Sequence, residues 1–287
     1  MAITLGVSRP HHGAGDPDVA AAVGRVAGDT PEEPAAPAPA KDDEATAASR
    51  GRGTHGPSTR RTVDCKRKRC VALTFDDGPG LDTPRLLQVL ARRKAPATFF
   101  LVGQMLDGRR RTARQIARAG HEIGVHTWAH PNLTTLPDKW VTWQLAHTKR
   151  LITEVTGVRP VLSRPPYGAS NPRVLRLQGE LGLSEVLWDV DTSDWKIRNS
   201  GYVSRTAVQR ARRNSVILMH DIRPTTVAAV DSMIRGLRRR GFTLVTVSEV
   251  IGKPVAGRTY FDWRTPTHQP ARRSTGGKKR PGRRSAH

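Results

Sequence analysis

The amino-acid sequence predicts an α/β domain in which parallel strands alternate with helices. Between residues 71 and 250, seven short runs rich in β-branched and aromatic residues alternate with longer stretches whose apolar residues recur at helical spacing. Parallel strands need crossover connections of this length, so the alternation favours a wound sheet or barrel over an all-α or all-β domain. Ionisable residues follow most of the runs, and the carboxyl ends of strands are where such folds place their sites.

The predicted strands and helices follow one another in a regular order. The strands are expected at residues 71–75, 97–102, 122–126, 161–164, 184–190, 216–219 and 242–247. The helices between them are expected from Thr83, where Pro84 follows the cap, at 112–119 and 138–156, from Asn171, where Pro172 follows the cap, and at 202–213 and 225–240. The crossover rule makes most of the strands parallel.

The two ends of the chain differ in composition from its centre. The 287 residues include 48 Lys and Arg against 25 Asp and Glu, a formal net charge of +23, and only 37% are hydrophobic. Residues 1–50 contain eight acidic and four basic residues, whereas residues 264–287 contain eight basic residues and no acid. Segments of this kind cannot build a core. We therefore expect a disordered segment at 1–62, a folded domain at 63–255 and a disordered basic tail at 256–287.

The basic tail has two interpretations. A run of charged residues is most often a solvated segment. Alternatively, the tail binds an anionic polymer by charge alone, such as wall teichoic acid, another anionic polysaccharide or nucleic acid. The sequence contains no helix-turn-helix, zinc-finger or RNA-recognition motif, which makes nucleic acid the weaker candidate.

Membrane segments and cysteines bear on where the protein works. No apolar run is long enough to span a membrane, and no signal peptide is visible in the first 30 residues. Cys65 and Cys70, the two cysteines, flank a Lys-Arg-Lys-Arg run. Their spacing favours a disulfide over free thiols, worth about 2 kcal/mol by loop entropy. Such a bond indicates an oxidising compartment.

Five predicted strands end in side chains that could carry chemistry. The ionisable residues at or just after these ends are Asp76 and Asp77, His126 and His130, Arg164, Asp191 and Asp194, and His220 and Asp221. Any one of them could be a cap, a turn residue or a buried structural histidine. Their recurrence at one edge of the predicted fold favours a common site.

Two of these segments together predict a metal site. Asp76 and Asp77 leave the strand in different directions, so one can bind a metal while the other faces the substrate. His126 and His130 would lie on one side of a helical turn. Two imidazoles and one carboxylate leave a position open for water or substrate, which is typical of a catalytic site for Zn²⁺, Co²⁺, Fe²⁺ or Mn²⁺.

The sequence resembles the polysaccharide deacetylases with the NodB-homology domain, carbohydrate esterase family 4. The five motifs of that family are matched at residues 74–79 (Thr-Phe-Asp-Asp-Gly-Pro), 126–130 (His-Thr-Trp-Ala-His), 164–168 (Arg-Pro-Pro-Tyr-Gly), 191–195 (Asp-Thr-Ser-Asp-Trp) and 218–220 (Leu-Met-His). The resemblance extends from about residue 65 to residue 250, with no substitution at a motif position. It implies a distorted (β/α) barrel of seven strands, which agrees with the strand count.

The resemblance also implies a role for each motif residue. Asp76 matches the catalytic base, and Arg164 resembles the residue that holds it in place. His220 matches the catalytic acid, which Asp194 orients. The remaining matches are Asp77, His126 and His130 as metal ligands, Tyr167 as the backbone N–H donor to the oxyanion, and Trp195 and Leu218 as walls of the acetyl pocket. The implied metal is Zn²⁺, with Co²⁺ or Mn²⁺ as alternatives.

The function implied by the resemblance is metal-dependent removal of N-acetyl groups from an N-acetylglucosamine-containing polysaccharide, with peptidoglycan as the leading substrate. Chitin, chitooligosaccharides and acetylxylan remain open as substrates, and the family implies a place outside the cell or in its envelope. A non-catalytic carbohydrate-binding protein on the same fold is the alternative from another class, but a binder has no need of a base and an acid. No Gly-x-Ser-x-Gly motif supports a serine hydrolase.

Overall fold

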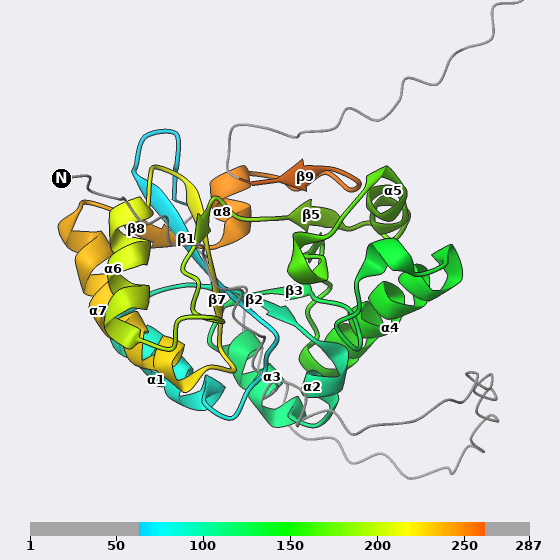
Figure 1. The fold of residues 1–287 in the computed structure, drawn as a ribbon, viewed down its shortest axis with the longest axis horizontal. Helices are drawn as coiled ribbons and strands as arrows, with labels where there is room; N and C mark the ends of the chain where they lie inside the picture. Colours follow the sequence, from blue (N-terminus) through cyan, green and yellow to red (C-terminus); the bar gives the residue numbers. More distant parts are fainter. Residues whose placement is uncertain (1–62, 262–287) are drawn as a thin grey trace, which may run out of the picture. The chain divides into compact units, whose positions relative to one another are not determined.

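The computed structural model describes residues 63–261, in which helices surround a single parallel sheet (Figure 1). The predicted disordered segment at 1–62 lies outside the described residues, as does the predicted tail from residue 262 onwards. Within residues 63–261, the predicted α/β fold is confirmed, with the strands forming a half-barrel. No helix in this part of the chain is both long and apolar enough to cross a bilayer.

The sheet is organised around its first strand, β1 (Cys70–Asp76), whose seven residues are all buried. Every strand pair is parallel, and the order is β6-β7-β1-β2-β3-β4-β5-β9, with β8 pairing with β1 off this path. The other strands are β2 (Thr98–Leu101), β3 (Glu122–Val125), β4 (Leu162–Ser163), β5 (Ser184–Val186), β6 (Val190–Asp191), β7 (Ser215–His220), β8 (Thr243–Val245) and β9 (Thr259–Tyr260). The carboxyl ends of all these strands therefore lie at the same edge of the sheet.

The helices form the outer layer, with α1, α6 and α7 on one side and α4 and α5 on the other (Figure 1). Their bounds are α1 (Thr83–Arg92), α2 (Gly103–Asp107), α3 (Arg110–Arg118), α4 (Asp138–Thr156), α5 (Pro172–Glu180), α6 (Ser200–Arg210), α7 (Pro224–Arg239) and α8 (Val247–Ile251). Two 3₁₀ turns, η1 (Leu133–Thr135) and η2 (Pro166–Gly168), lie in the connections. The predicted bounds of α4 are confirmed.

The two predicted helix caps have different outcomes. Asn171 caps α5 as expected, because its side chain accepts a hydrogen bond from the backbone N–H of Val174 at 2.9 Å. In α1 the cap is Asp82 rather than Thr83. The Thr83 hydroxyl is occupied elsewhere, since it donates to the buried carboxylate of Asp221.

The predicted strand at 184–190 is two strands that lie in different parts of the sheet. β5 pairs with β4 and β9, whereas β6 pairs with β7, so the three residues between them connect the two arms of the half-barrel. Asp189 in this connection accepts hydrogen bonds from the Val216 N–H at 2.7 Å and the Ser215 hydroxyl at 2.6 Å. The composition of residues 184–190 could not reveal this change of partner, because it depends on contacts with strands distant in sequence.

The folded domain extends beyond residue 255, where its end was predicted. Thr259 and Tyr260 form β9, which pairs with β5, and the Thr259 hydroxyl donates to the buried carboxylate of Glu185 at 2.9 Å. The prediction that the tail begins at residue 256 was therefore wrong for these residues. A two-residue strand contributes little to a composition window dominated by glycine, proline and charge.

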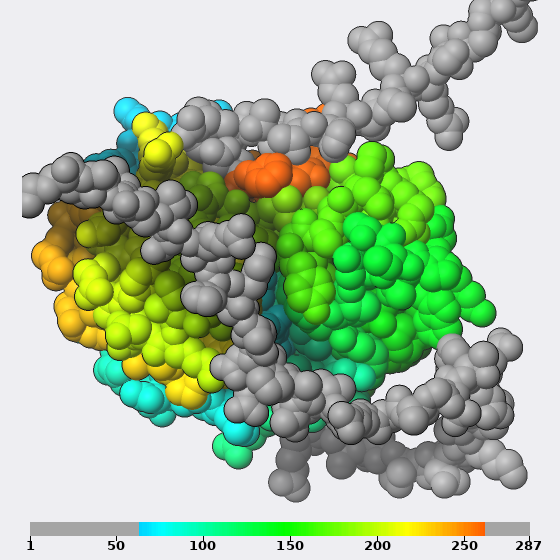
Figure 2. All heavy atoms as spheres, viewed as in Figure 1, coloured from blue at the N-terminus to red at the C-terminus, as the bar shows by residue number. Residues whose placement is uncertain are grey.

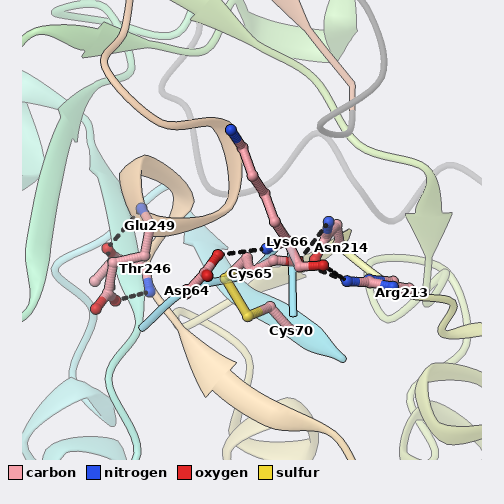
Figure 3. The surroundings of a disulfide bond; sticks show 8 residues. All are labelled: Asp64, Cys65, Lys66, Cys70, Arg213, Asn214, Thr246 and Glu249. Atoms are coloured by element: carbon pink, nitrogen blue, oxygen red, sulfur yellow. Dashed lines mark hydrogen bonds between the residues drawn. A yellow bond between two sulfur atoms is a disulfide. The ribbon is translucent and has the colours of Figure 1, made fainter. Parts of the chain in front are cut away.

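Cys65 and Cys70 form the expected disulfide at the amino end of β1 (Figure 3). Arg213 donates to the carbonyls of Cys65 and Lys66, and the backbone N–H of Asn214 donates to the Cys70 carbonyl at 2.7 Å. The disulfide thus closes a short loop at the start of β1, and these hydrogen bonds join that loop to the turn before β7. It lies at the opposite end of β1 from the predicted site.

Candidate active site

The carboxyl ends of β1 and β7 bring two of the predicted site residues together. Asp76 and His220 end these strands and are partners in the parallel register. Asp77 follows with a positive φ of 71°, which turns the chain sharply after the strand. As a result the two adjacent carboxylates occupy different surroundings, with the side chain of Asp76 3% exposed and that of Asp77 22% exposed.

The turn after β1 packs on a buried carboxylate. A Cβ atom at Gly78 would lie 2.2 Å from Oδ1 of Asp221, so only glycine fits at this position. Thr83 donates to the Asp221 carboxylate and accepts a hydrogen bond from the N–H of Gly80 at 2.7 Å. Burial raises the pKa of Asp221 to about 7. Asp221 therefore supports the turn that carries Asp77.

Asp77, His126 and His130 form a group that could hold a metal ion among residues 63–261. The Nε2 atoms of His126 and His130 lie 3.3 Å and 3.2 Å from Oδ1 of Asp77, and one ligand atom from each residue lies within 4.8 Å of the others. Oδ1 of Asp77 is buried and has no hydrogen-bond partner. An unpartnered carboxylate oxygen facing two imidazole nitrogens fits a divalent cation.

The charge of Asp77 also suits a cation. Burial alone would raise the pKa of its carboxyl group, but the contacts with His126 and His130 outweigh burial and hold that pKa well below its usual range. The carboxyl group is therefore ionised wherever the protein is folded near neutral pH.

The two histidines lie in a loop and not on the helical turn that their spacing suggested. The loop at residues 126–130 follows β3, and its backbone has positive φ values of 67° at Thr127 and 58° at His130. Two of its carbonyls accept hydrogen bonds from the first two N–H groups of α2 instead of closing a turn. The expectation of a helix was wrong, yet the two rings still lie 5.0 Å apart, centroid to centroid.

Helix α4 holds this loop through Gln144. The side-chain oxygen of Gln144 accepts hydrogen bonds from the backbone N–H groups of Trp128 at 2.8 Å and Ala129 at 2.9 Å. Gln144 is itself buried, on the face of α4 that packs on the core. The side chain thus replaces the backbone partners that a helical turn would have supplied.

Arg164 holds Asp76 from inside the domain. Its guanidinium is fully buried and donates to Oδ1 of Asp76 at 2.8 Å. It also lies over the ring of Phe100, 4.2 Å from the centroid. The other guanidinium contacts are hydrogen bonds to the Thr74 hydroxyl and to the carbonyls of Val186 and Leu187. Oδ2 of Asp76 takes no part in this network and lies 3.9 Å from Nε2 of His126.

His220 pairs with Asp194 on the neighbouring segment. Nδ1 of His220 lies 2.9 Å from Oδ1 of Asp194, and the backbone N–H of His220 donates to Oδ2 at 2.8 Å. The Thr226 hydroxyl donates to the same Oδ2 at 2.6 Å. Burial lowers the pKa of His220, but the Asp194 carboxylate, with further contributions from Asp76 and Asp77, outweighs burial and raises it to about 9. His220 is thus protonated near neutral pH, with Nε2 free of this pair.

The three predicted substrate-binding residues occupy different positions around this centre. Tyr167, in η2 with a φ of 63°, places its ring edge-on to His130 with centroids 4.8 Å apart. Leu218 is buried in β7, two residues before His220, so both side chains point to the same face of the sheet. Trp195 follows Asp194 and is 51% exposed.

Gln144, Asp221 and Thr226 support the site without having been assigned a role from the sequence. Gln144 had a usable signal, because it is a polar residue on the buried stripe of an amphipathic helix and such residues need a partner. Asp221 was among the residues noted after a strand end, but its partner Thr83 lies 138 residues away and could not be foreseen. Thr226 had no signal, since its partner Asp194 lies 32 residues away.

The pattern of the family described as polysaccharide deacetylase matches residues 63–186. A solved structure described as a deacetylase with substrate is 40% identical, with a TM-score of 0.67, over 69% of this chain and 99% of that one. The chain belongs to the polysaccharide deacetylase family. The site described above thus lies in a domain whose fold, and 40% of whose aligned residues, are also found in that solved structure.

Two curated relatives are named as peptidoglycan deacetylases. The peptidoglycan-N-acetylglucosamine deacetylase PgdA of Listeria monocytogenes is 38% identical over 69% of this chain and 42% of its own length. The peptidoglycan-N-acetylmuramic acid deacetylase PdaC of Bacillus subtilis is 39% identical over 66% of this chain and 40% of its own length. The chain therefore spans about two fifths of the length of these relatives.

Proposed function

We propose that this chain is a metal-dependent hydrolase that removes N-acetyl groups from the amino sugars of peptidoglycan. The observation that carries the proposal is the placement of Asp76 and His220 on paired strand ends beside the metal-ligand group. Amide hydrolysis needs a base and an acid in opposite protonation states at one pH. The names of the two curated relatives support peptidoglycan as the substrate.

Asp76 is the proposed general base. The Arg164 guanidinium is bound to Oδ1 of the carboxylate, so Oδ2 remains available to take a proton from water. The same ion pair fixes the direction of the carboxylate, because the guanidinium is itself held by three further hydrogen bonds.

His220 is the proposed general acid. Asp194 binds Nδ1 and keeps the ring protonated, which leaves the proton on Nε2 for the departing sugar nitrogen. Without this proton the sugar amine would have to leave as its deprotonated anion, RNH⁻, which is far too basic to depart.

Asp77, His126 and His130 are the proposed ligands of a divalent cation, with Zn²⁺ favoured and Co²⁺ or Mn²⁺ as alternatives. When bound, such a cation supplies the positive charge that polarises the acetyl carbonyl and acidifies water. The backbone N–H of Tyr167 is proposed to donate a hydrogen bond to the oxyanion that forms when water adds to the acetyl carbonyl. Leu218 and Trp195 are proposed to enclose the acetyl methyl group.

We also propose that the protein works in the cell envelope or outside the cell. The Cys65–Cys70 disulfide supports an oxidising compartment, and peptidoglycan as substrate requires the same location. The eight basic residues at 264–287 would favour an anionic wall polymer as a further partner.

Acetate release tests the function directly. The full chain is assayed on peptidoglycan, chitin oligomers and acetylxylan, with and without a chelator, followed by re-addition of Zn²⁺, Co²⁺ or Mn²⁺. We expect release from peptidoglycan that the chelator abolishes and one of the metals restores. Release from chitin oligomers or acetylxylan alone would correct the substrate. Retention on glycans with no acetate release under any condition would favour the non-catalytic alternative.

A further inference from the structure

Helix α4 carries a group of aromatic side chains that the proposed chemistry does not use. Trp140 and Trp143 are 36% and 38% exposed, which is unusual for side chains of this size. The ring of His147 stacks on that of Trp143, with centroids 4.9 Å apart and planes 9° apart, and Trp140 lies edge-on to Trp143 at 5.9 Å. We call Trp140, Trp143 and His147 the aromatic platform.

The aromatic platform is continuous with the loop that carries the metal ligands. Trp128, between His126 and His130 in that loop, packs edge-on against Trp143 at 5.9 Å and against His147 at 4.5 Å. Gln144, in the same helix, binds the backbone of the loop.

The order of the elements along the chain also places the aromatic platform near the candidate site. Helix α4 begins after the chain leaves the carboxyl end of β3, and the platform lies in the first three turns of the helix. The platform is therefore on the side of the sheet where the candidate site lies.

Two polar side chains, His147 and Arg150, lie at one edge of the aromatic platform. A hollow of about 270 Å³ beside it is lined by Trp143, Ala146, His147 and Arg150, and the Arg150 guanidinium lies 3.0 Å from Nδ1 of His147. Burial and the charge of Arg150 lower the pKa of His147, so its ring is neutral near neutral pH. Flat rings with hydrogen-bonding groups at their edge are complementary to a pyranose, which has C–H bonds on its faces and hydroxyls around its rim.

We propose that the aromatic platform binds sugar rings of the polysaccharide chain outside the residue that is deacetylated. This inference rests on the proposed function and adds to it that the substrate is an extended polymer. A chain lying across the metal-ligand loop would meet the catalytic groups and the platform at the same time. The platform would then strengthen binding of polymers and leave short oligosaccharides unaffected.

The first test measures binding without turnover. The full chain is mixed with insoluble peptidoglycan in the presence of a chelator. The peptidoglycan is first stripped of its phosphate-containing wall polymers, so that attraction between charges contributes little to retention. We expect W140F/W143F to be retained like the unchanged protein, because Phe keeps a flat ring. We expect W140A/W143A and W140L/W143L to bind about tenfold more weakly, because neither Ala nor Leu offers one. V255A, which shortens an exposed apolar side chain outside the platform, is the matched control.

The second test separates polymer from short substrate in the metal-loaded enzyme. W140A/W143A is expected to lower kcat/KM about tenfold on the polymer and to leave kcat/KM on a trisaccharide unchanged. Thermal unfolding and near-ultraviolet circular dichroism verify that the variants are folded, and W140A alone replaces the double variant if it is not.

Three results would overturn the inference. The first is retention of W140A/W143A equal to that of the unchanged protein. The second is full retention of W140L/W143L, which indicates a general apolar contact, and the third is a change of oligomeric state in W140A/W143A, which indicates that a second copy of the chain binds this surface. Platform-dependent retention without acetate release from any substrate would instead contradict the proposed function alone.

Discussion

The carboxylate of Asp76 and the guanidinium of Arg164 form an ion pair at 2.8 Å in which neither side chain is more than 3% exposed. A pair so far from water keeps both charges only while the two groups remain together, since the desolvation of each ion is offset by the other. The pair therefore links the stability of the domain to the proposed base.

Removing Arg164 is expected to destabilise the domain strongly. Arg164→Met leaves Asp76 buried without a partner, which typically costs about 3–5 kcal/mol. Urea unfolding of the variant measures this loss. The double variant D76N/R164M should lose less than the sum of the two single variants, because it leaves no buried charge. A single variant as stable as the unchanged protein would contradict the electrostatic role of the pair.

The Asp194–His220 pair is expected to make stability depend on pH. The folded pKa of His220 is raised from 6.5 to about 9, so its contribution is fully present below pH 6.5 and is lost as the pH rises through about 9. At one pKa unit per about 1.36 kcal/mol, this contribution reaches at most about 3 kcal/mol. Asp194→Asn should therefore destabilise the metal-free protein near neutral pH and much less above pH 9.

Urea unfolding at the two pH values measures this difference. The alkaline limb of the rate profile should move to lower pH in the same variant, because its His220 loses its proton earlier. A variant with the same pH dependence as the unchanged protein would show that Asp194 does not set the pKa of His220.

Metal content should separate the proposed ligands from the proposed base and acid. Asp77→Ala and His130→Ala are expected to lose the bound cation, measured by elemental analysis, and with it the rise in melting temperature that a bound metal gives. Asp76→Asn and His220→Ala should retain metal near the level of the unchanged protein and still lose turnover. Unchanged turnover in His220→Ala would refute its role as the acid.

Gln144 is expected to control metal affinity without touching the metal. Gln144→Leu removes the acceptor for two loop N–H groups and should weaken metal binding about 10- to 100-fold, the usual effect of losing a group that holds metal ligands in position. Gln144→Glu keeps a side-chain oxygen at the same position and should restore most of the affinity. Titration with Zn²⁺ compares the variants, and equal affinities for Leu and Glu would exclude this positioning role.

The elements that a local sequence pattern determines could be predicted from the sequence. Those that depend on partners distant in the chain could not. The periodicity of α4 and the cap at Asn171 are local, and both were predicted. The division of residues 184–190 into β5 and β6, and the addition of β9, depend on which strands lie alongside.

The same distinction applies to the site. Asp77, His126 and His130 were grouped from their motifs, and the structure brings their ligand atoms together. The loop conformation of residues 126–130 was not predicted, because Gln144 and α2 impose it from outside the segment.

The pairing of β1 with β7 also bears on how the chain is made. β1 is the first strand of the domain to be synthesised, yet its partner on one side begins only at Ser215, well over a hundred residues later. Until that segment emerges, an apolar strand that is wholly buried in the finished domain has an unpaired edge, and such edges favour aggregation. A domain of this topology should fold slowly and only after most of it has left the ribosome, so its yield in a producing cell should depend on the chaperones available.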